Sequence, residues 1–314
     1  MNIITFLTPA NLAAEKEKFF SSPSYHPIFT YAWGSPAARA WAANVPKYTQ
    51  LTAAIVEQDG PGTVAAAKEL FATSITPPLL KLAKEITSQA PAKLPETPLA
   101  AIVEAFADAF QQLGLPEYSI AIVDHHGFNF RPNPRNKRIL MSRHISPDFF
   151  SVDGEIKHEL VHIIRYENEK FNRLPRARQY LPTEEGLAAY CQDYGAEGGA
   201  AALFQHAAEY TATEVALRGS LREVIEHLLS IGFSPELAWQ RAVRHKFGWK
   251  DTAQPGDIMK PSMYFYHQQL VRKLTDDERC RLFVGKIGID QLSEYPAYTG
   301  RVPVKKLRDF YRLG

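Results

Sequence analysis

The chain has 314 residues, of which 45% are hydrophobic and 22% are charged. This composition is that of a globular protein and excludes a disordered one, and the length allows one large domain or two moderate ones. The 36 lysines and arginines nearly balance the 34 aspartates and glutamates. The charge therefore provides no general attraction to nucleic acid or to an anionic membrane, and we expect neither as a partner.

Two features bear on the cellular compartment. The two cysteines, Cys191 and Cys280, are too few for a disulfide framework or a thiolate zinc site, which favours a reducing compartment. The N-terminal segment MNIITFLTPANLAAEKEKFF has no basic beginning, and its apolar run is too short for a signal peptide. No window reaches the roughly 18 apolar residues of a membrane span. We therefore expect a cytoplasmic protein, and the sequence leaves its oligomeric state open.

The first third of the chain predicts helices. Five segments share a proline or threonine start, a helical period and a glycine or proline stop; they are residues 8–22, 35–58, 62–75, 77–90 and 97–114. Two short β-branched segments, 118–124 and 137–144, predict strands, and a short alternating stretch and a proline-rich turn separate them. Helices are expected again at 153–170, 183–194, 198–217, 219–231 and 234–246.

These elements predict a mostly helical α+β protein with a small sheet and a boundary near residue 115. We expect an N-terminal helical region, 1–115, and a second region that holds the candidate site, 116–314. Alternatively, the two regions form one compact unit.

The segment GEIKHELVHIIRYENEKF, residues 154–171, places two histidines four residues apart. At about 100° per residue, its apolar side chains cluster on one face of a helix; they are Ile156, Leu160, Ile163 and Ile164. His158, His162 and Arg165 cluster on the opposite face, and Glu159 lies between the two. Imidazoles at i and i+4 can bind one Zn²⁺, and the intervening carboxylate can accept a proton from water. The alternative interpretation is a solvated polar face.

A third ligand is expected from the segment YLPTEEGLAAYCQDY, residues 180–194. Thr183 is a plausible N-cap there, so that Glu184 and Glu185 would lie in the first turn of a helix and face the histidines. The alternative is that they are helix-capping acids. Two histidines on one helix and a glutamate on the next resemble the zinc peptidases of the thermolysin and aminopeptidase-N type. In those enzymes the glutamate ligand often precedes a small residue, which favours Glu185 over Glu184.

A closer resemblance covers residues 25–275. HELVHIIRYEN and LPTEEGLAAY are similar to the motifs of the tyrosine carboxypeptidase-like family, which includes microtubule-associated tyrosine carboxypeptidases and bacterial QEGLA-motif proteins. HPIFTYAW resembles the family's Asn-Pro-x-Phe-x-Tyr segment, with His26 in place of asparagine. MKPSMYFYHQQLV resembles its Lys-Asp-x-x-Tyr segment, with Pro261 in place of aspartate. The family has three residues between the glutamate and the second histidine, whereas only Leu160 and Val161 intervene here.

The resemblance implies a gluzincin-like metallopeptidase fold, with a small antiparallel sheet beside the zinc-binding helix in the region 116–314. It implies one Zn²⁺ per chain, held by His158, His162 and Glu185, with Glu159 as the general base. Tyr264 is the first candidate to stabilise the oxyanion of the reaction, and Tyr266 and His267 are alternatives. The segment MYFYH could instead be an aromatic core segment. The remaining histidines singled out, His125, His126, His144 and His245, are expected at the surface or in hydrogen bonds, not as ligands.

The expected substrate is the C-terminal tail of a protein or peptide, from which the resemblance implies removal of an aromatic residue. A carboxypeptidase must bind a free carboxylate, which an arginine does best. Arg241 and Arg244 are the first candidates for this role. Arg165 is the other candidate, because it lies on the same helix face as the histidines. It could instead anchor a carboxylate behind the metal ligands. Two alternatives remain: an endopeptidase with the same site, and a non-catalytic regulatory or interaction protein that retains the metal.

Overall fold

A computed structural model describes residues 6–33, 35–36, 40, 46–92, 94–124, 128–145, 149–177 and 179–313. The chain divides into two compact units, each made from two separate stretches of sequence. Unit 1 comprises Met1–Ala90 and Ala207–Met263, and unit 2 comprises Pro91–His206 and Tyr264–Gly314. The chain passes between them within helices α10 (Gly199–Ala216) and α13 (Lys260–Arg272).

This division differs from the predicted boundary near residue 115. Helix α7 (Leu99–Leu113) belongs to unit 2, and residues 207–263 return to unit 1. A change from helical to strand composition marked the expected boundary, but units are defined by which residues pack together, and packing joins segments distant in sequence.

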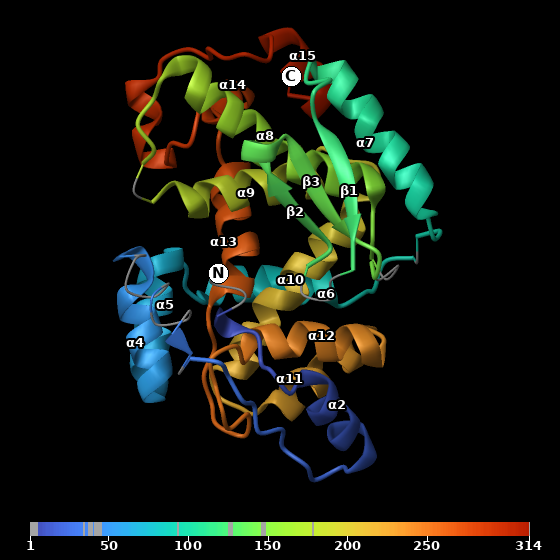
Figure 1. Cartoon of the computed structure of the whole chain (residues 1–314), viewed down its shortest axis with the longest axis vertical. Helices are drawn as coiled ribbons and strands as arrows, with labels where there is room; N and C mark the ends of the chain where they lie inside the picture. The colour runs from blue at the N-terminus through green and yellow to red at the C-terminus, as the bar shows by residue number, and fades with distance from the viewer. Residues whose placement is uncertain are drawn as a thin grey trace. The chain divides into compact units, whose positions relative to one another are not determined.

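Unit 1 is helical in its described residues. Its elements are α2 (Leu12–Ser21), the 3₁₀ turn η1 (Pro46–Tyr48), α4 (Thr49–Glu57), α5 (Gly60–Phe71), α6 (Pro77–Thr87), the second half of α10, α11 (Leu221–Ser230) and α12 (Pro235–His245). Helices α4 and α5 lie side by side, as do α11 and α12 (Figure 1). The predicted start of α12 is confirmed, because the Ser234 hydroxyl accepts a hydrogen bond from the Leu237 backbone N–H at 3.4 Å.

Unit 2 holds the sheet and the two histidine- and glutamate-bearing helices. Its elements are α7, β1 (Ser119–Val123), β2 (Phe130–Asn133), η2 (Pro134–Asn136), β3 (Arg138–Ser142), α8 (Val152–Asn172), α9 (Tyr180–Asp193), the first half of α10, most of α13, α14 (Asp276–Arg281), η3 (Leu282–Val284), η4 (Ile289–Glu294) and α15 (Val304–Tyr311). The protein is therefore mostly helical with one small sheet in its described residues, as the sequence predicted.

The sheet is mixed, which corrects the predicted antiparallel arrangement. Its strand order is β1-β3-β2. β2 pairs with β3 antiparallel across a short turn, but β1 pairs with β3 in parallel, with Ile120 opposite Ile139. The reason is that β1 and β2 form the two edges of the sheet, and β3, which follows them in sequence, lies between them. β3 is thus the central strand and offers no open edge, while Pro132 lies on an edge strand, where a missing N–H is tolerated.

Helix α8 packs against α9 and lies beside the sheet (Figure 1). The Ser151 side chain caps its N-terminus by accepting from the Gly154 N–H at 3.0 Å, and Arg173 ends it with a left-handed φ of 54°. Its apolar face is in the core, as predicted from Leu160 and Ile163, which are 0% exposed. The opposite face is also almost entirely buried, so the polar side chains there are not a solvated surface. Among the described residues, no helix is long and apolar enough to cross a membrane.

Candidate metal centre

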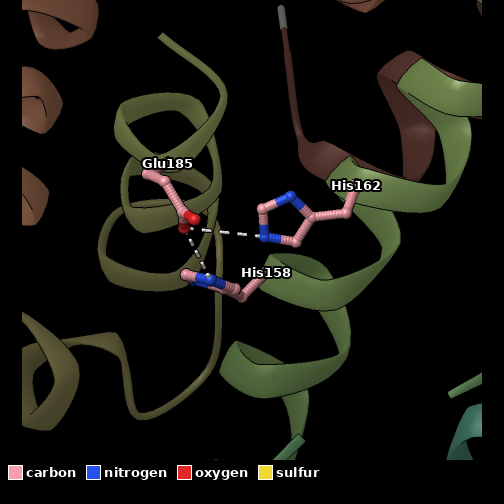
Figure 2. A group of neighbouring side chains, drawn as sticks. All are labelled: His158, His162 and Glu185. Carbon is pink, nitrogen blue, oxygen red and sulfur yellow. Dashed lines mark ion pairs between the residues drawn. The ribbon is translucent and has the colours of Figure 1, made fainter. Parts of the chain in front are cut away.

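Helices α8 and α9 bring together the three side chains predicted as zinc ligands. His158 and His162 lie one turn apart on α8 and face Glu185 on α9 (Figure 2). The Nε2 atom of each histidine is 3.7 Å from Glu185 Oε2. The three ligand atoms all lie within 4.8 Å of one another, and among the described residues this is the one group of histidine, cysteine and acidic side chains so arranged.

This geometry fits a zinc ion. Bonds of ~2.0–2.1 Å in a tetrahedral site separate neighbouring ligand atoms by about 3.4 Å, close to the distances observed here. Two histidines and one carboxylate are also the donor set of a catalytic zinc site, which leaves a fourth position for water or substrate. The histidine side chains are 11% and 13% exposed and that of Glu185 is 13% exposed, so none of the three is fully buried.

His162 is oriented from behind by Glu184. The His162 Nδ1 and Glu184 Oε1 atoms are 2.9 Å apart, and Lys286 Nζ donates to both Glu184 oxygens at 2.6 Å. Burial by itself would raise the pKa of Glu184, but Lys286, His162 and Arg165 together hold that pKa well below its usual range. Glu184 therefore remains a carboxylate, accepts the Nδ1 proton and directs the Nε2 lone pair of His162 towards Glu185.

His158 is held by an amide instead. Its Nδ1 lies 2.9 Å from Gln192 Oε1, and Gln192 Nε2 donates to Glu155 Oε1 at 2.9 Å. This orientation of the amide makes Nδ1 the donor of the imidazole and Nε2 its electron-pair side. Two imidazole lone pairs and a carboxylate oxygen thus converge on one point, an arrangement that a cation there would stabilise.

The choice between the two glutamates follows from these contacts, which favour Glu185 as the ligand. The predicted reason for their position was wrong, however. Helix α9 begins at Tyr180 with Gln179 as its N-cap, so Thr183 is not the cap, and no acidic residue lies in the first turn. Pro182 lies in the first turn of the helix, where backbone N–H groups have no hydrogen-bond partner within the helix. A proline is therefore tolerated there, and the helix can begin before the predicted start.

Gly186 allows helix α9 to approach α13 beside Glu185. A Cβ added at Gly186 would lie 2.5 Å from His267 Cβ and 2.8 Å from its backbone carbonyl carbon. Such distances are too short for any side chain, so the absence of one allows α9 to touch α13 here. The glycine that follows the two glutamates is therefore required by helix packing beside the candidate ligand.

Glu159 is buried next to the ligands and lacks a hydrogen bond at Oε2. Burial raises the pKa of this carboxyl to about 8, and the nearby Glu155 and Glu185 add to the effect while His162 opposes it. An unpaired buried carboxyl group is costly and rarely persists without a role. Its position one residue after the first histidine suits a group that exchanges a proton with water at the metal.

The ring of Tyr264, the predicted oxyanion-stabilising residue, lies on α13 with its centroid 6.3 Å from that of His158. The same ring stacks on His206, with centroids 5.7 Å apart and planes 4° from parallel. The alternatives are placed less favourably: His267 packs with its Cβ against Gly186 and is 6% exposed, and the Tyr266 ring lies edge-on to it.

Sequence patterns do not mark two residues that contact the site. Gln192 lies 34 residues from His158, and Lys286 lies 102 residues from Glu184, in no spacing that indicates a motif. Tertiary packing alone brings them to the site, so only the folded structure identifies them.

The three arginines predicted to bind substrate behave differently. Arg165 is 0% exposed and donates to the backbone carbonyls of Gly285 and Ile287, and its Nη1 is 3.7 Å from Glu184 Oε2. A side chain buried to this extent does not reach a substrate carboxylate, so the substrate-binding role is proposed for Arg241 and Arg244 only. The role left for it is the other one considered, as an anchor of the carboxylate behind His162.

Arg241 and Arg244 belong to unit 1, whereas the histidines belong to unit 2. Both approach Glu209 Oε1, at 3.1 Å from Arg241 Nη1 and 3.6 Å from Arg244 Nη1. Arg244 keeps 33% of its side chain exposed and Arg241 keeps 17%. Their role towards substrate stays a prediction.

The other histidines were expected in hydrogen bonds or at the surface. His144 lies near the surface, with its Nε2 2.8 Å from Asp124 Oδ1. His245 is fully buried, between Asp257 Oδ2 at 2.6 Å and Glu209 Oε2 at 2.8 Å. His125 and His126 lie outside the described residues.

Neither a scan against protein-family models nor a search of curated proteins gives a match for this chain.

Proposed function

We propose that this chain is a zinc-dependent metallopeptidase of the gluzincin kind. The observation that carries the proposal is the convergence of His158, His162 and Glu185 on one point, with the unpartnered carboxyl of Glu159 beside it. A zinc ion in this position supplies a Lewis acid that polarises the scissile carbonyl and lowers the pKa of water.

The chain's own residues would perform the proton transfers. Glu159 accepts a proton from the attacking water and delivers it to the leaving amine nitrogen. A pKa of about 8, raised by burial, suits a group that must both accept and release a proton near neutral pH. Tyr264 is the candidate donor to the carbonyl oxygen as that oxygen becomes negative.

Within this class we propose a carboxypeptidase that acts on exposed C-terminal tails and removes an aromatic residue, in keeping with the resemblance to the tyrosine carboxypeptidase-like family. Arg244 and Arg241 are the proposed partners of the substrate carboxylate, now without Arg165. An endopeptidase with the same catalytic residues is the nearest alternative, and the two differ in whether a free C-terminus is required.

A non-catalytic protein that retains a structural metal is the alternative of another class. Structural zinc sites have four protein ligands, whereas three converge here among the described residues. Such a protein would also have no use for the unpaired buried carboxyl of Glu159. Both observations favour the enzyme.

The test is peptide hydrolysis by the zinc-loaded protein on a library that contains each sequence with a free and with an amidated C-terminus. We expect release of single C-terminal residues from the free peptides only, and none from a Glu159→Gln variant with the same zinc content. Glu169→Gln, on the same helix and paired with Arg176, is the matched control and should retain full activity. Equal cleavage of amidated peptides would replace the carboxypeptidase with an endopeptidase, and inactivity of the wild type across the library would favour the non-catalytic protein.

A further inference from the structure

Unit 2 contains a groove that is separate from the candidate metal centre. Helix α7 packs against both α8 and α15 (Figure 1), and residues of all three helices line the groove. Its volume is about 490 Å³, within the range of ~300–1,000 Å³ that is usual for ligand pockets. None of the three proposed metal ligands lines it, and every lining residue belongs to unit 2.

The floor of the groove is apolar. Phe150 and Ile156 line it and belong to the hydrophobic core, and Phe310 on α15 packs against the same core. On α7, Ala105 and Ala109 line the groove four residues apart, on one side of the helix. Their short side chains leave space that larger residues would fill. An apolar side chain of another molecule would be removed from water here, which stabilises a complex.

The charged side chains that line the groove are all acidic. They are Asp108 on α7, Asp153 at the start of α8 and Glu197 after α9, and no described lysine or arginine joins them. Asp153 is already paired, because Lys157 Nζ lies 3.0 Å from its Oδ2. Asp108 and Glu197 are exposed, and their carboxylates form no hydrogen bond or ion pair with a described residue. The groove therefore carries two unpaired negative charges.

The segment that carries Glu197 is held in place without a partner. Its backbone N–H donates to Asp153 Oδ2 at 2.7 Å, and its carbonyl accepts from the Ser151 hydroxyl. Gly198 has a left-handed φ of 72°, and a Cβ there would lie 3.2 Å from Ser151 Oγ and from Leu94 Cδ1. Because the backbone is already fixed, binding at this edge of the groove orders few additional groups.

We propose that this groove binds a peptide segment of another protein in which a bulky apolar side chain is flanked by lysine or arginine. The apolar side chain packs on Phe150 and Ile156, and the cations pair with Asp108 and Glu197. A second copy of this chain is a poorer occupant, because a two-fold contact through the groove would bring two acidic surfaces together. The inference does not depend on the proposed peptidase function, since the groove and the candidate metal centre share no residue.

The probes are short synthetic peptides with a fluorescent label and an amidated C-terminus, in three matched sets. The first set holds leucine or phenylalanine flanked by lysine or arginine. The second replaces the basic residues with glutamate, and the third replaces the apolar residue with serine. Fluorescence anisotropy with the zinc-loaded full chain measures affinity, and any peptide that is cut is measured with the Glu159→Gln variant instead. We expect saturable binding of the first set only, weakened by added salt because salt screens exposed charge pairs.

Substitutions in the groove locate the binding. Asp108→Lys combined with Glu197→Lys should weaken the affinity for the first set by ~10-fold, with unchanged thermal unfolding because both side chains are exposed. Ala105→Phe fills the groove and should have a similar effect on affinity. Glu294→Lys is the matched control, an exposed acid of unit 2 that does not line the groove, and should bind as the wild type does. His162→Ala should also bind normally, because the metal centre contributes no residue to the groove.

Four results would overturn the inference. They are binding of no peptide set, equal binding of the basic and acidic sets, an unchanged affinity in the charge-reversal variant, and a loss of binding in His162→Ala, which would place the peptide at the metal centre. A wild-type dimer in sedimentation velocity that the charge reversal dissociates would make a second copy the occupant, and would also overturn it. None of these measurements requires hydrolysis, so a failure of the proposed peptidase function leaves the inference standing.

Discussion

Glu184 and Glu185 are neighbours in sequence but belong to different layers of the site. The first is neutralised by Lys286 and faces the Nδ1 side of His162, and the second faces the Nε2 atoms of both histidines. Adjacent positions on a helix point about 100° apart, so one helix can supply both the proposed ligand Glu185 and the carboxylate that orients His162.

This division predicts unequal effects on zinc binding. Glu185→Ala should abolish stoichiometric zinc because two ligands remain, whereas Glu184→Ala should weaken the affinity by ~10–100-fold, the usual effect of losing a partner behind a ligand. Zinc content after dialysis measures the loss in Glu185→Ala, and a competition titration against a chelator measures the weakened affinity of Glu184→Ala. A loss of zinc confined to Glu184→Ala would show that the carboxylates are assigned the wrong way round.

Buried charge in unit 1 predicts a pH dependence of stability. Burial lowers the pKa of His245, but Asp257 and Glu209 outweigh it and raise the pKa to about 9. Because the unfolded value is about 6.5, His245 stabilises the fold fully below pH ~6.5, and this contribution is lost as the pH rises through 9. Lys246 is also buried in unit 1, and desolvation lowers its pKa to about 8. Its contribution to stability therefore increases as the pH rises, opposite to that of His245.

A comparison of wild type with His245→Gln isolates the histidine, since both proteins share the titration of Lys246. We expect the difference in their free energies of unfolding, from urea titration, to shrink by on the order of 3 kcal/mol between pH 6.5 and pH 9. A difference that grows over this range would mean that His245 is neutral in the folded state.

At the scale of elements, the contact between α9 and α13 lies at the residue that follows Glu185. It depends on Gly186, whose missing side chain lets the backbone of His267 approach. Helix propensity alone would favour alanine over glycine at this position by ~1 kcal/mol. The helix contact that glycine permits must therefore stabilise the protein by more than this amount.

Gly186→Ala should therefore destabilise the protein by ~1–3 kcal/mol through overpacking, despite its better propensity, and should lower zinc affinity by displacing Glu185. Gly60→Ala at the start of α5 is the control, because a Cβ there would lie 3.9 Å from its nearest neighbour, Trp249 Nε1. Urea unfolding measures the stability of both variants, and zinc titration measures their affinity for the metal. An unchanged Gly186→Ala protein would mean that the helices separate at no cost.

For the whole molecule, the proposed ligands all belong to unit 2, on two helices that the loop between them joins. A bound ion would cross-link α8 to α9 in the folded state only, so zinc binding and folding must be linked. Free zinc at 100 times its Kd should raise the free energy of unfolding by ~2.7 kcal/mol.

Thermal unfolding with and without zinc tests this linkage. The melting temperature of the wild type should rise with added zinc and return with a chelator, while that of His162→Ala should not respond, because its two remaining ligands cannot hold the ion. An equal response in both proteins would place the stabilising zinc elsewhere.

The sequence alone determined those features that depend on neighbours along the chain. Helix periods, proline starts and the cap at Ser234 predicted most helices of the described chain, and the i, i+4 spacing placed His158 and His162 on one face. Local propensity and helical geometry are sufficient for such features.

Only the tertiary structure decided the rest. Four features arise from contacts between residues far apart in sequence: the parallel pairing of β1 with β3, the burial of Arg165, the contacts of His158 with Gln192 and of Glu184 with Lys286, and the division into units made of discontinuous segments. Such contacts form because burying shared apolar surface brings distant elements together, and a local pattern does not record which partner an element finds.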